Sequence, residues 1–425
     1  MDLEHPVRLL VEDDLERSRL TVFFRWLLAI PHILWAIIWS VGVFFAAIAN
    51  WAVTLVRGRP PDGLHAFMSS YVRYLSHLYA YLWLAASPYP GFVGEEGTYP
   101  VDVTLPPPDS QPRWQTFFRI FLAVPVLLLA AAIGGAGAWF QAGGRRGGGT
   151  YSWGSSVSGL ASTTAVLAWF ATLARGRTPK GFRDVAAYAV GYQAQVLAYL
   201  LLVTARYPSA DPTALLETVE RPPLHPVHLV GDAHDLRRSR VLVFFRLPLA
   251  IPHIVWLLLW TIAALVAVVV NWFVLLVRAR PADPLHRFVS RYVRYGLHVY
   301  AFLFLAANPF PGFTGEAGSY PLDLVLPAAQ RQHRGKTLGR AILAIPAIIV
   351  SGALGGVLYL AAFLTWFVAL ARGSAPWGLR NVSAYALRYQ AQVNAYLLLL
   401  TDTYPHSSPL EGAADAQQAL ELDVG

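Results

Sequence analysis

The chain has 425 residues, of which 56% are hydrophobic and only 14% are charged. Soluble domains carry roughly a quarter charged residues, so this balance favours a membrane protein over a large soluble protein with buried helices. The absence of cysteine excludes disulfides, thiolate metal sites and cysteine nucleophiles. The net charge of +8 does not predict nucleic-acid binding, because basic residues beside membrane spans set topology and meet anionic lipid headgroups.

The first predicted element is a short strand that recurs along the chain. Alternating apolar segments follow a His-Pro or Tyr-Pro pair in four places: PVRLLVE (6–12), PVDVTLP (100–106), PVHLVG (226–231) and PLDLVLP (321–327). Alternation is typical of a strand, and the bilayer core excludes strand edges that face lipid. We therefore expect the four strands to form one small sheet outside the membrane.

The second element is an apolar run with an arginine inside it. Residues 22–31 read VFFRWLLAIP, and the six-residue interval from arginine to proline occurs four times: Arg25–Pro31, Arg119–Pro125, Arg246–Pro252 and Arg340–Pro346. A long uncharged run follows, and residues 32–56 contain no Asp, Glu, Lys or Arg. Runs of about 18 or more such residues are candidate membrane spans.

The arginine has a physical interpretation. As one helix, residues 23–56 would measure about 51 Å, whereas the hydrocarbon core is roughly 30 Å thick. We interpret FFRWLLAI as an amphipathic turn in the interface, with its guanidinium among lipid headgroups and a kink at Pro31. Arg25, Arg119, Arg246 and Arg340 are then expected at one membrane interface, each six residues before a kink. The alternative is a re-entrant hairpin.

A short basic loop and a more polar helix complete the pattern. The loops are RGRPPDG (57–63), RGRTPKG (175–181), RARPADP (278–284) and ARGSAPWG (371–378). Proline and glycine end the apolar helix there, and a helix such as residues 66–87 follows. Short loops carry most of the topology signal, so we place the basic loops in the cytoplasm.

These elements predict a mainly α, polytopic integral membrane protein, multi-pass in the cell membrane. Its fourfold internal repeat would consist of a strand, an interfacial turn, a long kinked helix, a basic loop and a helix. About eight membrane helices and a small extramembrane sheet result. The predicted repeat units are 1–98, 99–210, 211–319 and 320–405, with a disordered tail at 406–425. The second unit has a Gly-rich insertion near 141–156, which we expect to be a solvated loop.

The chain resembles a known family. The YPVxL strand, FFRxxLAIPH, NWFxxLVRGRP and the aromatic helix YVRYxxHxYAY together resemble a bacterial membrane-protein family, domain of unknown function 4389. The match covers nearly the whole chain as tandem copies. The second and fourth repeats are degenerate, since Ala168 and Thr365 replace the Asn of NW. The resemblance implies a membrane location and brings no agreed activity.

Two histidines are the candidate cofactor ligands. His77 and His298 occupy equivalent places, where the other two repeats have Gln195 and Gln392. A pair of opposed histidines can hold a haem, whereas the alternative is hydrogen bonding across packed helices. We favour packing and predict no cofactor, no metal site and no catalytic residue, with haem as the open alternative.

Other polar residues are predicted to hold helices together or to bind lipid. Asn50 and Asn271, with Gln195 and Gln392, are candidates for helix packing or for a permeation path. A second set of arginines at one shared offset, Arg73, Arg294 and Arg388, is expected to neutralise lipid phosphate or to cap the positive side of the bundle.

We find no Asp or Glu within a predicted span, although proton- or sodium-coupled transporters commonly carry one. The sequence therefore favours a non-enzymatic scaffold, assembly or lipid-organising component that contacts anionic headgroups and other membrane proteins. The alternatives are a transporter or channel built from internal repeats and a haem- or quinone-binding redox subunit.

Overall fold

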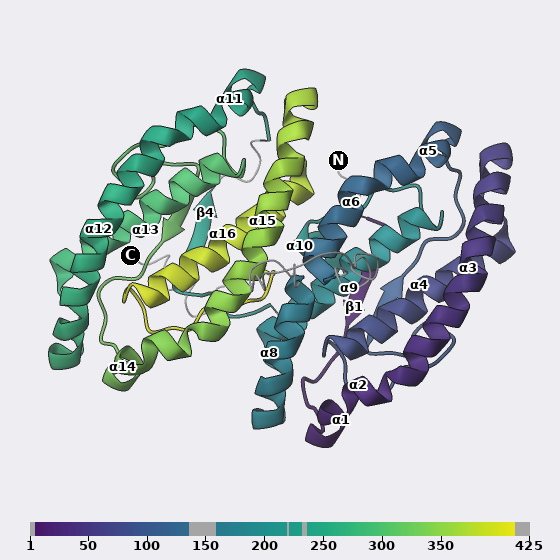
Figure 1. The fold of residues 1–425 in the computed structure, drawn as a ribbon, viewed down its shortest axis with the longest axis horizontal. Helices are drawn as coiled ribbons and strands as arrows, with labels where there is room; N and C mark the ends of the chain where they lie inside the picture. Colours follow the sequence, from purple (N-terminus) through teal and green to yellow (C-terminus); the bar gives the residue numbers. More distant parts are fainter. Residues whose placement is uncertain (1–4, 136–158, 219–220, 232–235, 413–425) are drawn as a thin grey trace, which may run out of the picture. The chain divides into compact units, whose positions relative to one another are not determined.

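The computed structural model describes residues 5–135, 159–218, 221–231 and 236–412. The chain forms two compact units (Figure 1). Unit 1 comprises residues 1–221 with 408–410, and unit 2 comprises 222–407 with the residues from 411 onward. Each unit holds two of the four predicted repeats. The Gly-rich insertion near 141–156 lies outside the described residues.

Unit 1 contains three strands and nine described helices. They are β1 (Arg8–Val11), α1 (Arg19–Phe23), α2 (Arg25–Leu28), α3 (Ile30–Arg57), α4 (Asp62–Leu82), β2 (Val101–Thr104), α5 (Arg113–Phe117), α6 (Arg119–Gly134), α8 (Leu160–Arg175), α9 (Lys180–Leu200), α10 (Pro212–Leu215) and β3 (Leu216–Thr218).

Unit 2 repeats this order with fewer interruptions. Its described elements are β4 (His228–Gly231), α11 (Arg240–Phe244), α12 (Arg246–Arg278), α13 (Asp283–Leu303), β5 (Leu322–Val325), α14 (Arg334–Leu343), α15 (Ile345–Arg372) and α16 (Trp377–Leu397). We call α1, α5, α11 and α14 the leading helices, α3, α6, α8, α12 and α15 the apolar helices, and α4, α9, α13 and α16 the closing helices.

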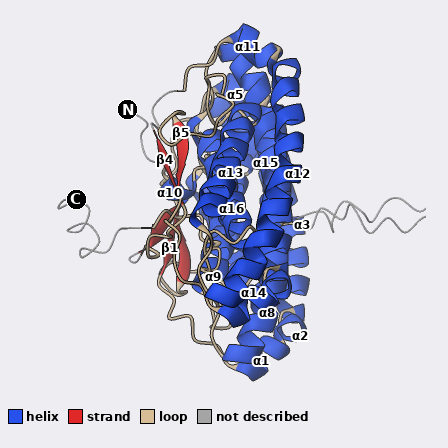
Figure 2. Ribbon diagram, turned by 90° about the vertical axis from the view of Figure 1, so that its left-hand side faces the viewer, coloured by secondary structure: helices blue, strands red, loops and turns tan. Residues whose placement is uncertain are grey.

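Each unit has three layers. The closing helices lie in the middle, because they contact the apolar helices on one side and the strands on the other. In Figure 2 the strands lie alongside the helices rather than beyond their ends. The order fits the polarity of the helices: the closing helix α4 buries polar side chains such as Arg73 and His77 among apolar ones, whereas the apolar helix α3 has no charged residue before Arg57.

The strands form two sheets and not the single sheet that we expected. In unit 1 the order is β2-β1-β3, with β1 antiparallel to β2 and parallel to β3. In unit 2, β4 and β5 pair antiparallel. The alternating segments come from different repeats, and they pair only within the unit in which their closing helices pack together.

A break in the helix lies next to the predicted kink position only at Pro31 and Pro346. Helices α3 and α15 begin at Ile30 and Ile345, so that their prolines lie in the first turn, where the missing N–H is not needed. In the other two repeats Pro125 and Pro252 lie inside continuous helices. In three of the repeats the chain leaves helical geometry at the phenylalanine immediately before the arginine, as at Phe24.

The leading helices bind the repeats of a unit to each other. Helix α5 packs on α3, and α1 packs on α8. The indole of Trp51 donates to Thr116 O at 2.9 Å, and Trp169 donates to Val22 O at 2.9 Å. Unit 2 has the same reciprocal pair, from Trp272 to Thr337 O and from Trp366 to Val243 O. Each repeat thus holds the end of the other repeat's apolar helix.

One expectation stays a prediction and another needs correction. Within the described residues, three helices are long and apolar enough to cross a membrane: 25–57, 246–278 and 345–372. The closing helices are more polar and are not among the three, so about eight membrane helices stay a prediction. The predicted disordered tail is ordered at its start, where Tyr385 donates to Ser407 O at 2.7 Å and His406 N donates to Gln392 Oε1 at 3.0 Å.

Candidate functional site

The four arginines of the apolar runs are buried at the carboxyl ends of the closing helices. Their exposed fraction lies between 1% and 4%. Arg25 donates to Tyr81 O and, at 3.1 Å, to Ala86 O, and Arg119 donates to Tyr199 O and, at 3.0 Å, to Thr204 O. Arg246 and Arg340 donate to the equivalent carbonyls: Phe302 O, Ala307 O, Tyr396 O and Thr401 O.

The expected position of these guanidinium groups among lipid headgroups does not fit their burial. Each lies over an aromatic ring of the closing helix, for example Arg25 at 4.2 Å from the centroid of Tyr81. The last carbonyls of a helix have no partner within it and carry partial negative charge. A buried guanidinium satisfies several of them at once, and the aromatic face adds attraction to the cation. These arginines therefore act as helix caps.

The same ends contain leucines in the left-handed conformation. Leu84, Leu202, Leu305 and Leu399 have φ between 61° and 67°, where glycine is normally preferred. Leu84 is buried with Val22 and Ala168, and Leu305 is buried with Val243 and Ala369. A glycine would relieve the strain but remove this packing.

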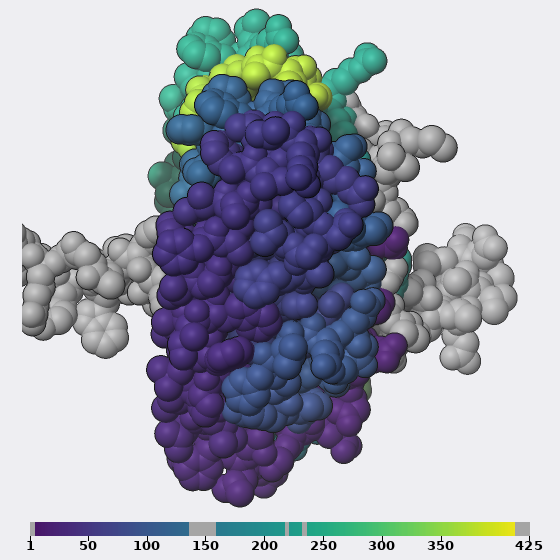
Figure 3. All heavy atoms as spheres, turned by 90° about the vertical axis from the view of Figure 1, so that its right-hand side faces the viewer, coloured from purple at the N-terminus to yellow at the C-terminus, as the bar shows by residue number. Residues whose placement is uncertain are grey.

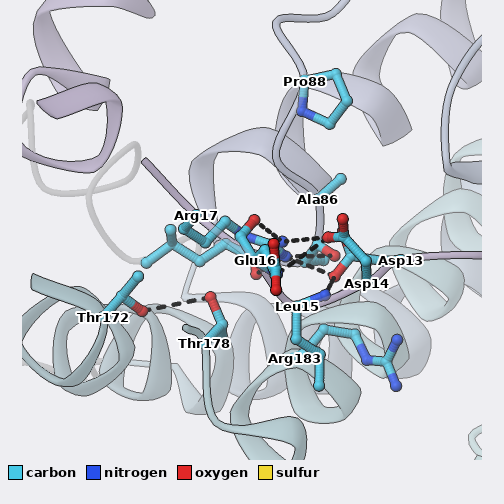
Figure 4. Close-up of polar contacts among 12 residues, drawn as sticks. Asp13, Asp14, Leu15, Glu16, Arg17, Ala86, Pro88, Thr172, Thr178 and Arg183 are labelled. Carbon is cyan, nitrogen blue, oxygen red and sulfur yellow. Dashed lines mark hydrogen bonds and ion pairs between the residues drawn. The ribbon is translucent and has the colours of Figure 1, made fainter. Parts of the chain in front are cut away.

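A second polar side chain caps each leucine carbonyl. Arg17 donates to Leu84 O at 3.4 Å and pairs with Asp13 at 2.6 Å, as Figure 4 shows beside Ala86. Arg238 donates to Leu305 O, whereas Gln111 and Gln332 do the same for Leu202 O and Leu399 O. These caps could not be predicted from the sequence, because an arginine in a charged segment such as DDLER is usually solvated.

His77 belongs to a buried charged cluster that ties a strand to a closing helix. Its Nε2 lies 2.9 Å from Asp102 Oδ1 on β2, and Arg73 Nε lies 3.4 Å from the same oxygen. In unit 2, His298 Nε2 lies 2.8 Å from Asp323 Oδ1, and Arg294 Nε lies 3.4 Å from it. The two histidines thus occupy separate units, and each uses Nε2 on a carboxylate.

The carboxylate is held in its ionised form. Burial raises the pKa of Asp102, but hydrogen bonds from His77, Gly97 and Val103 outweigh it, so that the pKa lies below its usual range. The pKa of Asp323 is lowered in the same way, with Gly318 the first of its donors. Neither aspartate was among the residues predicted from the sequence. The signal was present, since PVDV and PLDL place a charge inside an apolar strand.

Gln195 and Gln392 perform the same task without charge. Gln195 Nε2 donates to Val7 O at 2.8 Å, and Ser209 N donates to Gln195 Oε1 at 2.9 Å. Gln392 Nε2 donates to Val227 O at 3.0 Å. These glutamines therefore attach closing helices to the chain that leads into β1 and β4.

Asn50 and Asn271 also make packing contacts. Asn50 Nδ2 donates to Leu201 O at 3.1 Å at the end of α9, and Asn271 Oδ1 accepts from Ala282 N at 3.1 Å before α13. Both residues are fully buried. A permeation path through them stays a prediction.

The second arginine set differs from what a lipid-phosphate site requires. Arg73 and Arg388 are buried, and Arg294 is partly buried. Arg73 reaches Glu96 at 3.2 Å on the strand side of α4, and Arg388 lies over the ring of Tyr385. These arginines lie within the protein, and their role toward lipid stays a prediction.

Many exposed apolar side chains of the described residues lie on the apolar helices. In unit 1 we define the apolar face by exposed side chains of α3 and α6: Leu34, Ile38, Val41, Phe45, Ile48, Phe121, Val124 and Leu128. The equivalent face of unit 2 comprises Val255, Leu259, Ile262, Val266, Val269, Ile349 and Phe363. Figure 3 shows the early part of the chain, in purple, at the surface of unit 1. Exposed apolar patches of this extent mark contact with a membrane or a partner.

The comparisons with known proteins identify the family. A family model described as a domain of unknown function, DUF4389, matches residues 19–93, 240–314 and 334–408, which together make up just over half of the chain. The chain belongs to this family. The second predicted repeat is not among the matched stretches. No curated protein and no solved structure matches the chain.

The resemblance seen in the sequence is thereby confirmed, with three tandem copies. Among the described residues, no group of three or more His, Cys, Asp or Glu side chains could hold a metal ion. The family description names no activity. The features that bear on function are therefore the exposed apolar face and the buried polar contacts that hold the helices behind it.

Proposed function

We propose that this chain is a non-enzymatic integral component of a bacterial cell membrane, where it acts as a scaffold, assembly factor or lipid-organising protein. The single observation that supports the proposal is the apolar face of each unit. Transfer of such surface from water to acyl chains is favourable by roughly 25 cal/mol per Å², so lipid is the solvent that suits it. We keep the multi-pass topology of the sequence analysis as a prediction.

The proposal also includes four copies of one repeat. The family model does not match the second repeat, but its closing helix α9 ends in the same way as the other closing helices. Arg119 donates to Thr204 O beyond the end of α9 and to Gln111 Oε1. The non-enzymatic part has its own support. His77 and Asp102, the most reactive-looking pair, are buried against each other and against backbone donors.

The apolar face can be tested by a charge placed within it. Val41→Asp introduces a carboxylate in the middle of α3, where insertion scales give a cost of about 3 kcal/mol. We expect retention in alkaline-washed membranes to fall several-fold. The matched control is Leu10→Asp, since Leu10 is 40% exposed but lies in β1, and its retention should equal that of the parent chain. Equal retention of both variants would contradict the proposal.

The lipid-organising role needs a second measurement. Purified chain in vesicles should raise the order reported by a polarity-sensitive membrane dye, in proportion to the protein-to-lipid ratio. Uptake of ions or solutes, reduced by Asn50→Leu or Asn271→Leu, would instead support a transporter. A Soret band in the purified protein would support the haem-binding alternative.

A further inference from the structure

The layer order of each unit restricts the angle at which its apolar helices can meet the bilayer plane. The strands pack on the sides of the closing helices and not beyond their ends (Figure 2). The turn at Gly94 is pressed against Ser70 O and Tyr74 N in the body of α4, and Glu95 and Glu96 in the same turn are exposed. In unit 2, Gly315 is pressed against Arg291 O and Tyr295 N of α13 in the same way.

If the apolar helices crossed the bilayer along its normal, the strand layer would lie at membrane depth. The open edges of β2 and β3 would then face acyl chains, and so would the acidic turn. Each unpaired backbone group in hydrocarbon costs several kcal/mol, and an exposed carboxylate costs about 3 kcal/mol more. A perpendicular arrangement is therefore unfavourable for each unit.

The lengths of the helices point the same way. The helical stretches 25–57 and 246–278 each contain 33 residues, which corresponds to about 50 Å. To fit a hydrocarbon core of roughly 30 Å, such a helix would need a tilt of more than about 50°, whereas observed tilts reach about 40°. A single layer of helices is about 10–12 Å thick and fits within one leaflet of about 15 Å.

The two ends of a unit are alike in charge. At one end of unit 1, Arg113 donates to Val56 O at 2.9 Å beside Arg57, and at the other end Arg19 donates to Ala174 O at 3.2 Å beside Arg175. These four arginines are exposed. Unit 2 has Arg334 on Val277 O and Arg240 on Ala371 O. Basic pairs at both ends suit one layer of anionic headgroups that surrounds the apolar face.

We propose that each unit lies flat on the membrane, with its apolar helices parallel to the bilayer plane and inserted into one leaflet of an anionic bilayer. This orientation would replace the multi-pass topology that is kept above as a prediction. The strands and closing helices then face water on the same side. This inference depends on the proposed function, because it assumes that the apolar face contacts lipid.

The depth of residues along α3 tests the proposal. The chain has no cysteine, so spin labels can be attached singly to Leu34→Cys, Val41→Cys and Ile48→Cys in vesicles of phosphatidylglycerol and phosphatidylethanolamine. The first and last positions are about 21 Å apart along the helix. A flat unit gives all three labels the same depth within one leaflet. A spanning helix gives depths that differ by 10 Å or more, and this result would overturn the inference.

Matched positions separate the inference from the proposed function. Val255→Cys, Ile262→Cys and Val269→Cys on α12 should repeat the uniform depth, since these residues are equally exposed. A label at Leu10→Cys should be fully accessible to a water-soluble nickel complex, whereas a spanning unit would place it against lipid. If the α3 labels themselves are accessible to the nickel complex, the proposed membrane function fails. If they are in lipid at graded depths, only the flat orientation fails.

Discussion

The closing helices α4 and α13 hold their strands differently from the closing helices α9 and α16. On α4 and α13 a histidine and an arginine bind a buried strand aspartate. On α9 and α16 a glutamine binds the carbonyl of Val7 or Val227. The ends of all four helices are nevertheless capped by a buried arginine. The middle of a closing helix can thus be attached to the neighbouring chain by either a charged or a neutral side chain. The carboxyl end of each of these four helices, by contrast, is capped by a buried arginine.

The largest expected effect comes from removal of the common feature. Arg25→Leu removes the guanidinium donor from the buried Tyr81 O and Ala86 O and leaves Tyr81 O with the backbone donor Leu84 N, and each lost bond costs about 1–3 kcal/mol. We expect the free energy of unfolding in detergent to fall by about 3 kcal/mol or more. The control is Arg19→Leu, because Arg19 also donates to a carbonyl but is exposed, and it should change stability by less than about 0.5 kcal/mol. Similar losses in both variants would show that burial of the cap is irrelevant.

The charged attachment should matter more than the neutral one. Asp102→Asn removes the ionic acceptor of His77 and Arg73, and hydrogen bonds to charged groups contribute about 1.5–3 kcal/mol. We expect a loss of about 2 kcal/mol, against about 1 kcal/mol for Gln195→Leu. Denaturant titration of the two variants in the same detergent would measure the difference. A larger loss for the glutamine would reverse the comparison.

Acid should destabilise both units through the histidines that precede their first strands. Burial lowers the pKa of His5 and of His225 to about 4, below the ordinary value of about 6.5. The stability is therefore complete above about pH 6.5 and is lost as the pH falls toward 4, by up to about 3 kcal/mol for each histidine. Thermal unfolding should show this loss, and His5→Asn with His225→Asn should reduce it. An unchanged pH profile in the double variant would exclude these groups.

The smallest effect concerns the end of α12. The other described apolar helices that precede a basic loop end at a left-handed glycine, as at Gly58, but α12 ends at Ala279 with φ 56°. Because a left-handed non-glycine residue costs roughly 1 kcal/mol, Ala279→Gly should stabilise unit 2 by about that amount. Gly58→Ala should destabilise unit 1 by a similar amount. Calorimetry of both variants would test the pair.

The sequence was sufficient for the elements and for the family, because apolar runs and fixed offsets are local. The same local patterns predicted the wrong environment for the side chain of Arg25. An arginine beside an apolar run is expected to be exposed, whereas the end of α4 covers Arg25 in the structure. The partners Asp102 and Gln111 were missed because they approach from segments distant in the chain. Likewise, the order of the three layers depends on which side of a closing helix the strands pack, and no local sequence pattern determines that side.

The reciprocal tryptophan bonds, from Trp51 to Thr116 O and from Trp169 to Val22 O, have an evolutionary consequence. In a single repeat, the tryptophan would have no carbonyl acceptor from a second leading helix, and its own leading helix would receive no indole donor. Two identical copies would supply both contacts through a symmetric interface. A chain that carried a single such repeat would therefore be expected to form a homodimer, and fusion of two such genes would turn that intermolecular interface into the interior of one unit.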